Sequence, residues 1–384
     1  MRTWMKQAIR QIDHGIGRLG RRRVLVDLRT PVCAAVLGPV YAALDRRPDV
    51  TVSFTSEYPD RVRALIAGRD VVTHAEAAWR RYDLYLNADP WAAPRLRRCA
   101  ARMNFFHGVA GKYDLDRPVG LPMGFEHYDR IAFINRDRMT QYLEAGVVSP
   151  AQARLVGYPK LDRLAAGMID GAGIRSALGL DDSRPTVLYA PTYSTASSLH
   201  LAGERIVSTL ADAGFNVLVK LHDRSLDADP KYTGGIDWRG RMRGLERPSR
   251  VCYVEGADSS PYLAAADVMV TDHSSVGFEY LTLDRPLVIF DAPGLAEAAR
   301  INPQKVELLR SAATVVRDAT ELVRGVSGAL AAPARLSMRR RQVASELFHD
   351  PGRATWRALA LVEELLTQRT RPAFANGPAR TEPC

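Results

Sequence analysis

The sequence lacks any apolar stretch long enough to span a lipid bilayer. Its longest uncharged apolar run, from Val32 to Leu44, has 13 residues and includes Gly38 and Pro39, whereas a membrane-spanning helix needs about 20 apolar residues. The basic amino terminus is followed by neither an apolar core nor a small-residue cleavage site, so we expect no secretory signal. These features predict a protein of the cytoplasm.

Cysteine is scarce, and common metal and nucleotide motifs are missing. The four cysteines form no C-x-x-C pair, which argues against a structural zinc site or a disulfide framework and fits a reducing compartment. Asp114 and Asp116 have D-x-D spacing but follow no apolar strand. There is no G-x-x-x-x-G-K-[S/T] loop and no G-x-G-x-x-G after a strand. We therefore expect neither a metal nor a cofactor. The cysteines are Cys33, Cys99, Cys252 and Cys384.

What the sequence does contain is an ordinary globular composition with its charge at the two ends. Hydrophobic residues make up 46% and charged residues 25%, which excludes a disordered or collagen-like chain. The length of 384 residues suits two domains of roughly 100–200 residues. Residues 1–23 hold seven basic side chains and one acid, and residues 335–384 hold nine arginines and five acids. The remaining 37 basic and 37 acidic side chains leave the middle neutral.

The first 23 residues form a basic amphipathic segment. Five apolar side chains recur at steps of 4, 3, 4 and 3, which places them on one stripe of a helix. Such a stripe with arginines behind it is typical of a helix that lies on an anionic membrane surface. In this interpretation, the protein is peripheral on the inner face of the cell membrane. It also suits packing on the protein's own surface, and both interpretations stay open. No aromatic platform accompanies the charge, so we expect no nucleic-acid partner. The stripe is Met5, Ile9, Ile12, Ile16 and Leu19.

From residue 24 onward, short apolar runs alternate with helical patterns, which predicts an α/β fold with largely parallel sheets. Two series of strands, separated by a stretch rich in Gly and Asp, predict two doubly wound Rossmann-like domains that face a cleft, a GT-B-like architecture. We expect an acceptor-side domain at 24–170, a nucleotide-donor domain at 171–335, closing helices at 336–368 and a disordered tail at 369–384. The expected strands are Val24–Leu28, Val50–Phe54, Tyr82–Leu86, Arg102–Phe106, Arg130–Ile134, Arg154–Val156, Thr186–Tyr189, Asn216–Leu221, Val251–Val254, Val268–Thr271, Leu287–Phe290 and Thr314–Val316.

Ligands of such sheets bind beyond the carboxyl ends of the strands, and two of these ends carry a histidine. In the first series, a strand delivers His107 to a turn in which Gly108 and Gly111 let the backbone approach a ligand closely. An imidazole there can take a proton from an attacking hydroxyl, or it can merely hydrogen-bond the turn. In the second series, His222 follows a strand at the matching place.

Hydroxyl groups follow two further strands of the second series. One strand ends in Ala-Pro-Thr, which brings Thr192 to the cleft or forms a plain structural turn. The other ends in Thr-Asp-His-Ser-Ser, residues 271–275, and opens a helix. The two serines can cap that helix, or its free backbone N–H groups can bind a phosphate, with His273 adding to the site. Glu279 lies about one turn further along, where it can meet a ribose or another diol.

In this order, the motifs resemble those of the CDP-glycerol glycerophosphotransferase family, which includes teichoic-acid and capsule polymerases. The resemblance spans roughly residues 100–295, and the first 100 residues show no matching motif. Departures include Val109-Ala110 for Thr-Pro, His273 for Tyr and Glu279 for Asp. The matching residues are His107-Gly108 with Lys112, Gly157-x-Pro159-x-x-Asp162, Tyr189-Ala190-Pro191-Thr192-Tyr193, His222, and Thr271-Asp272-His273-Ser274-Ser275 with Phe278-Glu279.

The resemblance implies a GT-B fold and metal-independent transfer of glycerol or ribitol phosphate from a CDP-activated donor to a polymer or lipid-linked acceptor. It implies that His107 is the base for the acceptor hydroxyl. It also implies that His222, Ser274 and Ser275 hold the pyrophosphate, and that Glu279 holds the ribose. The Gly-Tyr-Pro turn at residues 157–159 is expected to shape the floor of the cleft.

Two alternative functions remain open at the level of sequence. A GT-B glycosyltransferase or an epimerase acting on a sugar nucleotide would share the Ser-Ser helix and Glu279, but a glycosyltransferase would break a sugar C–O bond. A degenerate nucleotide-binding or scaffold protein would bind nucleotide without turnover, which the presence of both histidines and both serines disfavours.

Overall fold

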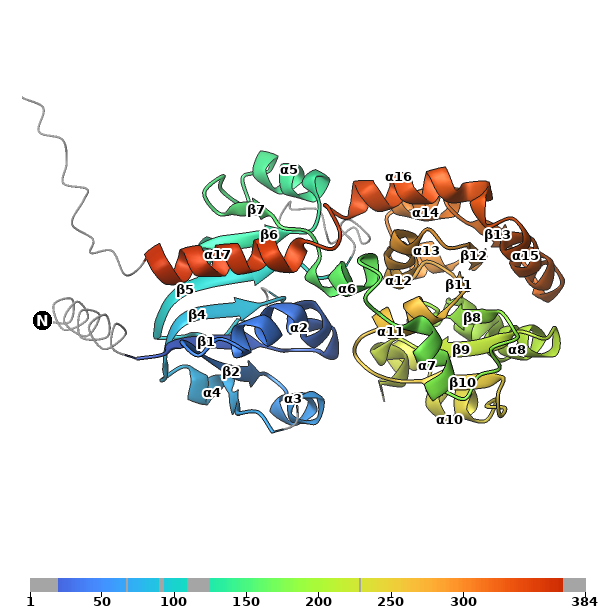
Figure 1. Cartoon of the computed structure of the whole chain (residues 1–384), viewed down its shortest axis with the longest axis horizontal. Coiled ribbons are helices and arrows are strands. Elements are labelled where there is room, and N and C mark those ends of the chain that lie inside the picture. Colours follow the sequence, from blue (N-terminus) through green and yellow to red (C-terminus); the bar gives the residue numbers. More distant parts are fainter. Residues whose placement is uncertain (1–19, 67, 90–92, 109–123, 228, 369–384) are drawn as a thin grey trace, which may run out of the picture.

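In the computed structural model, the described residues are 20–66, 68–89, 93–108, 124–227 and 229–368. The predicted amphipathic stripe and the predicted disordered tail lie outside these ranges. Two sheets stand side by side with helices on their faces (Figure 1). Every strand pair within both sheets is parallel. The expected α/β class with two doubly wound sheets is confirmed.

The first sheet has seven strands in the order β3-β2-β1-β4-β5-β6-β7. Its central strands are apolar and buried, as expected where helices cover both faces of a parallel sheet. Six of its strands were predicted; the seventh, β3, has only three residues and lies at the edge. The strands are β1 Arg22–Asp27, β2 Val50–Ser56, β3 Val71–Thr73, β4 Arg81–Asn87, β5 Arg98–Phe105, β6 Arg130–Phe133 and β7 Ala153–Leu155.

The second sheet has six strands in the order β10-β9-β8-β11-β12-β13. All six were predicted, five of them with both ends correct, because each is a short run of buried apolar residues bounded by turn residues. The strands are β8 Thr186–Tyr189, β9 Asn216–Lys220, β10 Val251–Val254, β11 Val268–Thr271, β12 Leu287–Phe290 and β13 Thr314–Val316.

Helices cover both sheets. Short 3-10 turns also occur, among them η3 Phe125–His127, η4 Pro159–Leu161, η5 Asp223–Leu226 and η6 Leu281–Leu283. A further one, η7, covers Pro333–Leu336. The α-helices are α2 Pro31–Asp45, α3 Pro59–Leu65, α4 His74–Ala77, α5 Arg136–Glu144, α6 Asp162–Ala165, α7 Gly171–Ala177, α8 Ser198–Asp212, α9 Pro230–Thr233, α10 Trp238–Arg243, α11 Ser260–Ala265, α12 Ser275–Tyr280, α13 Leu295–Ala298, α14 Pro303–Ser311, α15 Ala319–Ala331, α16 Ser337–Leu347 and α17 Ala354–Gln368.

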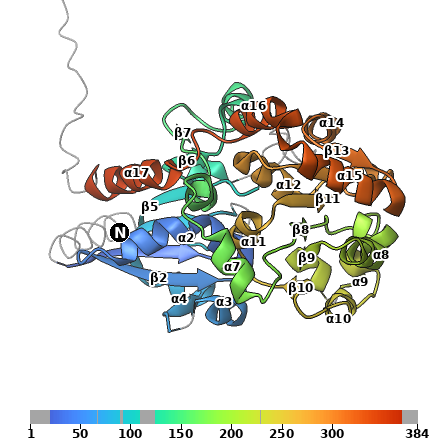
Figure 2. The same ribbon diagram turned by 45° about the vertical axis from the view of Figure 1, so that its right-hand side comes forward.

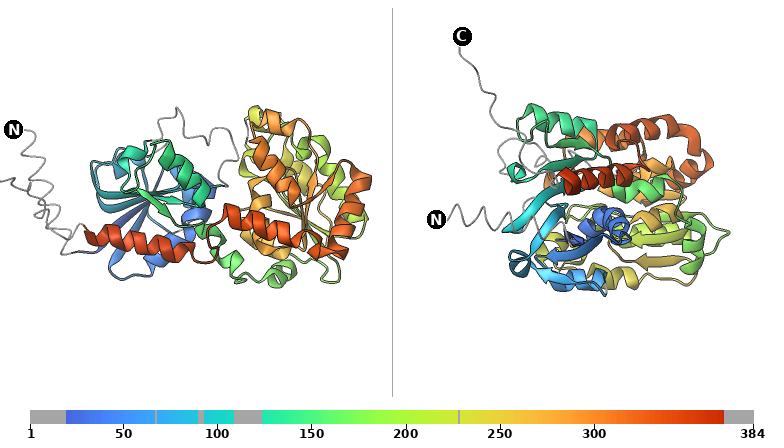
Figure 3. Two further views of the ribbon diagram at one scale, coloured as in Figure 1. Left: turned by 90° about the horizontal axis from the view of Figure 1, so that it is seen from above. Right: turned by 60° about the vertical axis from the view of Figure 1, so that its left-hand side comes forward.

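The chain passes between the two sheets twice. The first passage runs through η4, α6 and α7, and α7 packs against α11 of the second half (Figure 2). On the second passage, α16 packs against α12 and α14, whereas α17 returns to pack on α2, β4 and β5 of the first sheet (Figure 3). One continuous apolar core includes residues from both sheets, for example Leu25 in β1 and Met269 in β11.

The strand order of each sheet reverses at one point, between β1 and β4 in the first and between β8 and β11 in the second. Ligands of open parallel sheets bind at such reversals, outside the carboxyl ends of the strands. No helix within the described residues has the length and apolar character to cross a membrane.

Candidate active site

His107 lies just beyond β5, at the carboxyl edge of the first sheet. The buried ring of Phe106 packs against Phe125, Phe133 and Tyr142, with ring centroids 5.6, 4.8 and 5.3 Å away, and so fixes where the strand ends. The half-buried His107 places Nδ1 against the carbonyl oxygen of Ala88. A carbonyl only accepts a hydrogen bond, so Nδ1 carries the proton and Nε2 of the neutral ring is an acceptor.

Further polar side chains line the same edge, at the reversal between β1 and β4. Asp27, Asn87 and Asn104 are register partners across β1, β4 and β5. The buried Asp27 accepts a hydrogen bond from the hydroxyl of Tyr85 (2.7 Å) and pairs with His74 Nε2 (3.2 Å). Burial raises the pKa of Asp27, and His74 partly offsets that rise. No sequence motif pointed to this group.

Asp272 organises the carboxyl edge of the second sheet, at the reversal between β8 and β11. Its Oδ1 accepts hydrogen bonds from the backbone and hydroxyl of Thr192 (2.8 and 2.5 Å) and from the backbone of His273 (2.6 Å). Its Oδ2 accepts from the backbone and hydroxyl of Ser198 (3.0 and 2.9 Å). Asp272 is fully buried, so these five bonds replace the water that a carboxylate requires. Thr192 and Asp272 are therefore brought together as part of one buried network.

His222 follows β9, next to β8. Its Nδ1 accepts a hydrogen bond from the backbone N–H of Arg224 (3.1 Å), so the proton of the neutral ring is on Nε2. The Tyr193 ring lies against it, with centroids 4.5 Å apart. Nε2 is therefore a hydrogen-bond acceptor in neutral His107 and a hydrogen-bond donor in neutral His222.

A cation and a carboxylate flank His222. Burial lowers the pKa of Lys220, against the opposing effect of Asp223, and burial raises the pKa of Asp223. Lys220 Nζ donates to the carbonyl oxygen of Leu221 (2.8 Å). Lys220 was not predicted as a site residue, although it is the last residue of β9, two positions before His222.

Ser274 and Ser275 stand where β11 passes into α12. Ser274 occupies the N-cap position, but its side chain makes no capping hydrogen bond, which removes the main structural explanation for a serine there. Ser274 is buried and Ser275 is half-buried, while His273 beside them is buried. Gly277 keeps α12 close to β11, because a Cβ at that position would lie 3.2 Å from Thr271 Cγ2.

The segment from Gly157 to Asp162 joins the two edges. The backbone N–H of Gly108, next to His107, donates to the hydroxyl of Tyr158 (3.4 Å). Two residues further on, Lys160 Nζ donates to Glu279 Oε2 in α12 (2.6 Å). The carboxyl edges of the two sheets therefore meet on the two sides of this short segment.

The glycine and the aspartate of that segment each have a structural role. Gly157 has φ +93°, and a Cβ there would lie 2.5 Å from the carbonyl oxygen of His349. Asp162 accepts hydrogen bonds from the backbone N–H groups of Gly352, Ala354 and Thr355 (3.0, 3.0 and 2.5 Å) and so caps α17. The segment is thus bonded to the place where the chain crosses back.

Two of the predicted site residues, Lys112 and Glu279, need separate comment. Lys112 lies outside the described residues, as do Gly111 and Asp114. Glu279 is present at the expected turn of α12, but it is buried and ion-paired with Lys160, a partner the sequence analysis did not assign. Within the described ranges, no group of three His, Cys, Asp or Glu side chains is arranged to hold a metal ion.

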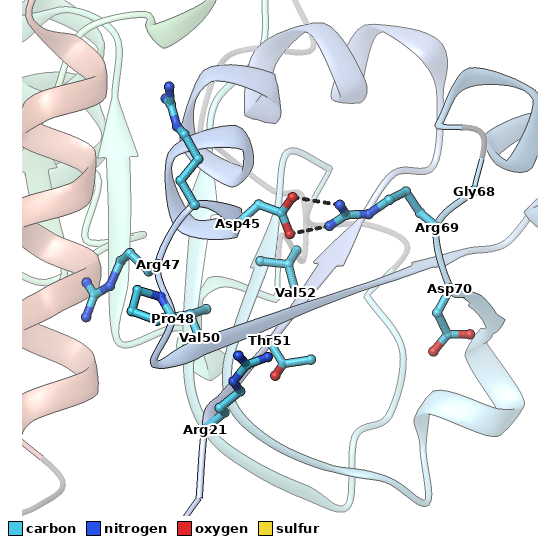
Figure 4. Close-up of a pocket in the computed structure, with 11 residues that line it drawn as sticks. Arg21, Asp45, Arg47, Pro48, Val50, Thr51, Val52, Gly68, Arg69 and Asp70 are labelled. Carbon is cyan, nitrogen blue, oxygen red and sulfur yellow. Dashed lines mark hydrogen bonds and ion pairs between the residues drawn. The ribbon is translucent and has the colours of Figure 1, made fainter.

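A surface hollow of about 430 Å³ lies away from this site, at the amino edge of the first sheet (Figure 4). Arg69 and Asp45 form an ion pair across it, and Arg47 is paired with Asp49 and Glu363. Arg21 and Arg46 add two more cations to the lining, and Asp70 adds the second carboxylate. Most of the charge around the hollow is therefore held in ion pairs, and the hollow lies close to the start of β1.

One of the comparisons with known proteins identifies a family. A family model described as CDP-Glycerol:Poly(glycerophosphate) glycerophosphotransferase matches residues 126–363. No curated protein matches the chain. Among solved structures, the Wall Teichoic Acid Polymerase TagF is 15% identical, with TM-score 0.67, over 91% of this chain and 90% of that one. The UDP-GlcNAc 2-epimerase from Neisseria meningitidis bound to UDP-GlcNAc is 13% identical, with TM-score 0.57, over 90% of this chain and 99% of that one. The similarity to solved structures shows the fold alone. The family model favours polyol-phosphate transfer over the chemistry of sugar nucleotides.

Proposed function

Because the chain belongs to the CDP-glycerol:poly(glycerophosphate) glycerophosphotransferase family, we propose that it transfers a polyol phosphate from a CDP-activated donor to an acceptor hydroxyl in surface-polymer synthesis. The family match over residues 126–363 carries this proposal. It also disfavours the sugar-nucleotide alternative, which the fold alone leaves open because the epimerase shares it.

In the proposed reaction, the acceptor oxygen attacks the β-phosphorus of the CDP-polyol. A new O–P bond forms, the bond from that phosphorus to the bridging oxygen breaks, and CMP leaves with the bridging oxygen. The hydroxyl proton passes to His107 Nε2, which its contact with Ala88 leaves as an acceptor. His222 Nε2 and the hydroxyls of Ser274 and Ser275 donate to the pyrophosphate and stabilise its charge. We assign the acceptor side to residues 24–170 and the donor side to residues 171–335.

A donor panel tests the proposed function. We expect CMP release from CDP-glycerol or CDP-ribitol when a polymer or lipid-linked acceptor is present, and no UDP release from UDP-sugars. UDP release without CMP release would favour the glycosyltransferase alternative. Nucleotide binding without any turnover would favour a degenerate binding protein.

The donor-site serines give a second prediction. Ser275→Ala should weaken CDP-glycerol binding by about 10-fold or more, because a hydrogen bond to a charged group contributes about 1.5–3 kcal/mol. His222→Asn should weaken binding and slow turnover together. Calorimetry measures the affinity for CDP-glycerol, and CMP release measures turnover. The exposed Ser345→Ala is the matched control. Unchanged affinity in Ser274→Ala, Ser275→Ala and His222→Asn alike would place the pyrophosphate elsewhere.

We further propose that the amino-terminal end contacts an anionic membrane surface. The excess of seven basic side chains over one acid in residues 1–23 supports this proposal. Attraction of this kind amounts to about 1 kcal/mol per Lys or Arg and weakens with salt. Deleting residues 1–20 should release the protein from anionic vesicles and leave its melting temperature unchanged. Equal sedimentation of both forms, or a lower melting temperature after deletion, would favour packing on the protein's own surface.

A further inference from the structure

Glu279 is held by a cation from outside its own sheet. Lys160, in η4, donates from Nζ to Glu279 Oε2 (2.6 Å) and to Ser259 Oγ (3.0 Å), and Ser259 in turn donates to the same Oε2 (3.4 Å). The side chains of Lys160 and Glu279 are only 6% and 3% exposed. Burial acts to lower the pKa of Lys160, but Glu279 and its other neighbours outweigh it, so the pKa is raised and the ammonium is retained.

The two oxygens of Glu279 are used unequally. Oε2 receives both of these hydrogen bonds, whereas no described residue donates to Oε1. A carboxylate has about four lone-pair sites, so the pair with Lys160 leaves one whole oxygen for another donor. Glu279 also lies four residues after Ser275 in α12, which places the two side chains on one face of the helix. The available oxygen therefore belongs to the same face as the proposed pyrophosphate ligand.

We propose that Lys160 is a positioning residue of the donor site: it fixes Glu279 through Oε2 and leaves Oε1 to accept the hydroxyls of the donor's ribose. This inference rests on the proposed function. It gives Lys160 a role through Glu279 without contact to the nucleotide. An ion pair this deeply buried contributes little net stability compared with a well-packed apolar pair, so fold stability alone does not account for it.

The geometry also connects the two halves of the reaction. Tyr158 contacts the backbone beside His107, and Lys160, two residues later, contacts the donor-side carboxylate. Pro159 between them fixes the backbone of the shared segment at the start of η4. Occupation of Oε1 by a ribose would therefore act on a segment that also touches the turn of the proposed base.

Calorimetric titration with CDP-glycerol and with its 2′-deoxycytidine analogue tests the inference. The wild-type protein should bind CDP-glycerol at least about tenfold more tightly than the 2′-deoxy analogue, because the analogue lacks one of the two ribose hydroxyls that would donate to Oε1 of the carboxylate. Lys160→Met should lose most of that preference: its affinity for CDP-glycerol falls by about tenfold or more, while its affinity for the analogue changes by less than about threefold. Lys160→Arg, which keeps a cation, should retain the preference.

The control variants separate this role from a structural one. Lys305→Met on α14 removes a lysine without an assigned role and should bind both nucleotides as the wild type does. If Lys160→Met does not fold, Lys160→Gln keeps a donor to Oε2 without the charge and is tested in its place. Equal weakening for both nucleotides, or an unchanged preference, would overturn the inference while leaving the proposed function intact. If the wild type binds neither nucleotide, the proposed function itself fails and the inference fails with it.

Discussion

His107→Asn is expected to slow transfer by about 10²–10⁴-fold at saturating donor, the contribution of a positioned general base, with no loss of donor affinity. Asparagine can keep the hydrogen bond from this position to the carbonyl of Ala88, so the turn after β5 should persist. What the variant lacks is a basic nitrogen at the place of Nε2. Single-turnover transfer measures the chemical step, and calorimetry with CDP-glycerol measures donor binding.

The matched control is His127→Asn in η3, an exposed histidine whose side chain is 68% accessible. It should leave both measurements unchanged. If His107→Asn reacts within tenfold of the wild type, then His107 only supports the turn. In that case Asp114, outside the described residues, is the next candidate for the base.

Asp272→Ala is expected to lower the free energy of unfolding by about 3–5 kcal/mol, as breaking a buried charged network typically does. The reason is that five hydrogen bonds from Thr192, Ser198 and His273 lose their acceptor in a fully buried position. Because natural domains have a stability of only about 5–15 kcal/mol, this loss should also weaken donor binding at the same edge.

Urea unfolding of the full chain measures that change. Asp182→Ala is the control, because the Asp182 side chain is 70% exposed and exposed substitutions usually stay within about 0.5 kcal/mol. A loss below about 1 kcal/mol for Asp272→Ala would mean that water or neighbouring groups replace the carboxylate. Asp272 would then not organise this edge.

The second sheet was the more predictable half of the fold. Each of its strands is an apolar run between turn residues, so hydrophobic pattern alone defines its ends, as in β8, β11 and β12. The first sheet was less sharply predicted: β5 begins at Arg98, four residues before the predicted start at Arg102, and β3 holds only Val71–Thr73. A three-residue edge strand has too few residues to show a periodic pattern.

Some residues of the candidate site could likewise be predicted from the sequence, and others could not. Side chains that directly follow a strand, such as His107, His222 and Asp272, could be predicted because parallel strands bring their carboxyl ends to one edge. Lys160 and Ser198 could not, because their partners lie 119 and 74 residues away and depend on how the chain crosses between the sheets. The segment that contains Lys160 was identified, but only the folded structure shows that the lysine pairs with Glu279.

A crystal structure of His107→Asn with CDP-glycerol tests the central claim most directly, namely that a CDP-polyol binds where the carboxyl edges of the two sheets meet. We predict the pyrophosphate within hydrogen-bonding distance of Ser274, Ser275 and His222, with the ribose hydroxyls at Glu279. A nucleotide bound elsewhere, for example in the arginine-lined hollow beside Arg21, with this edge left empty, would contradict the claim.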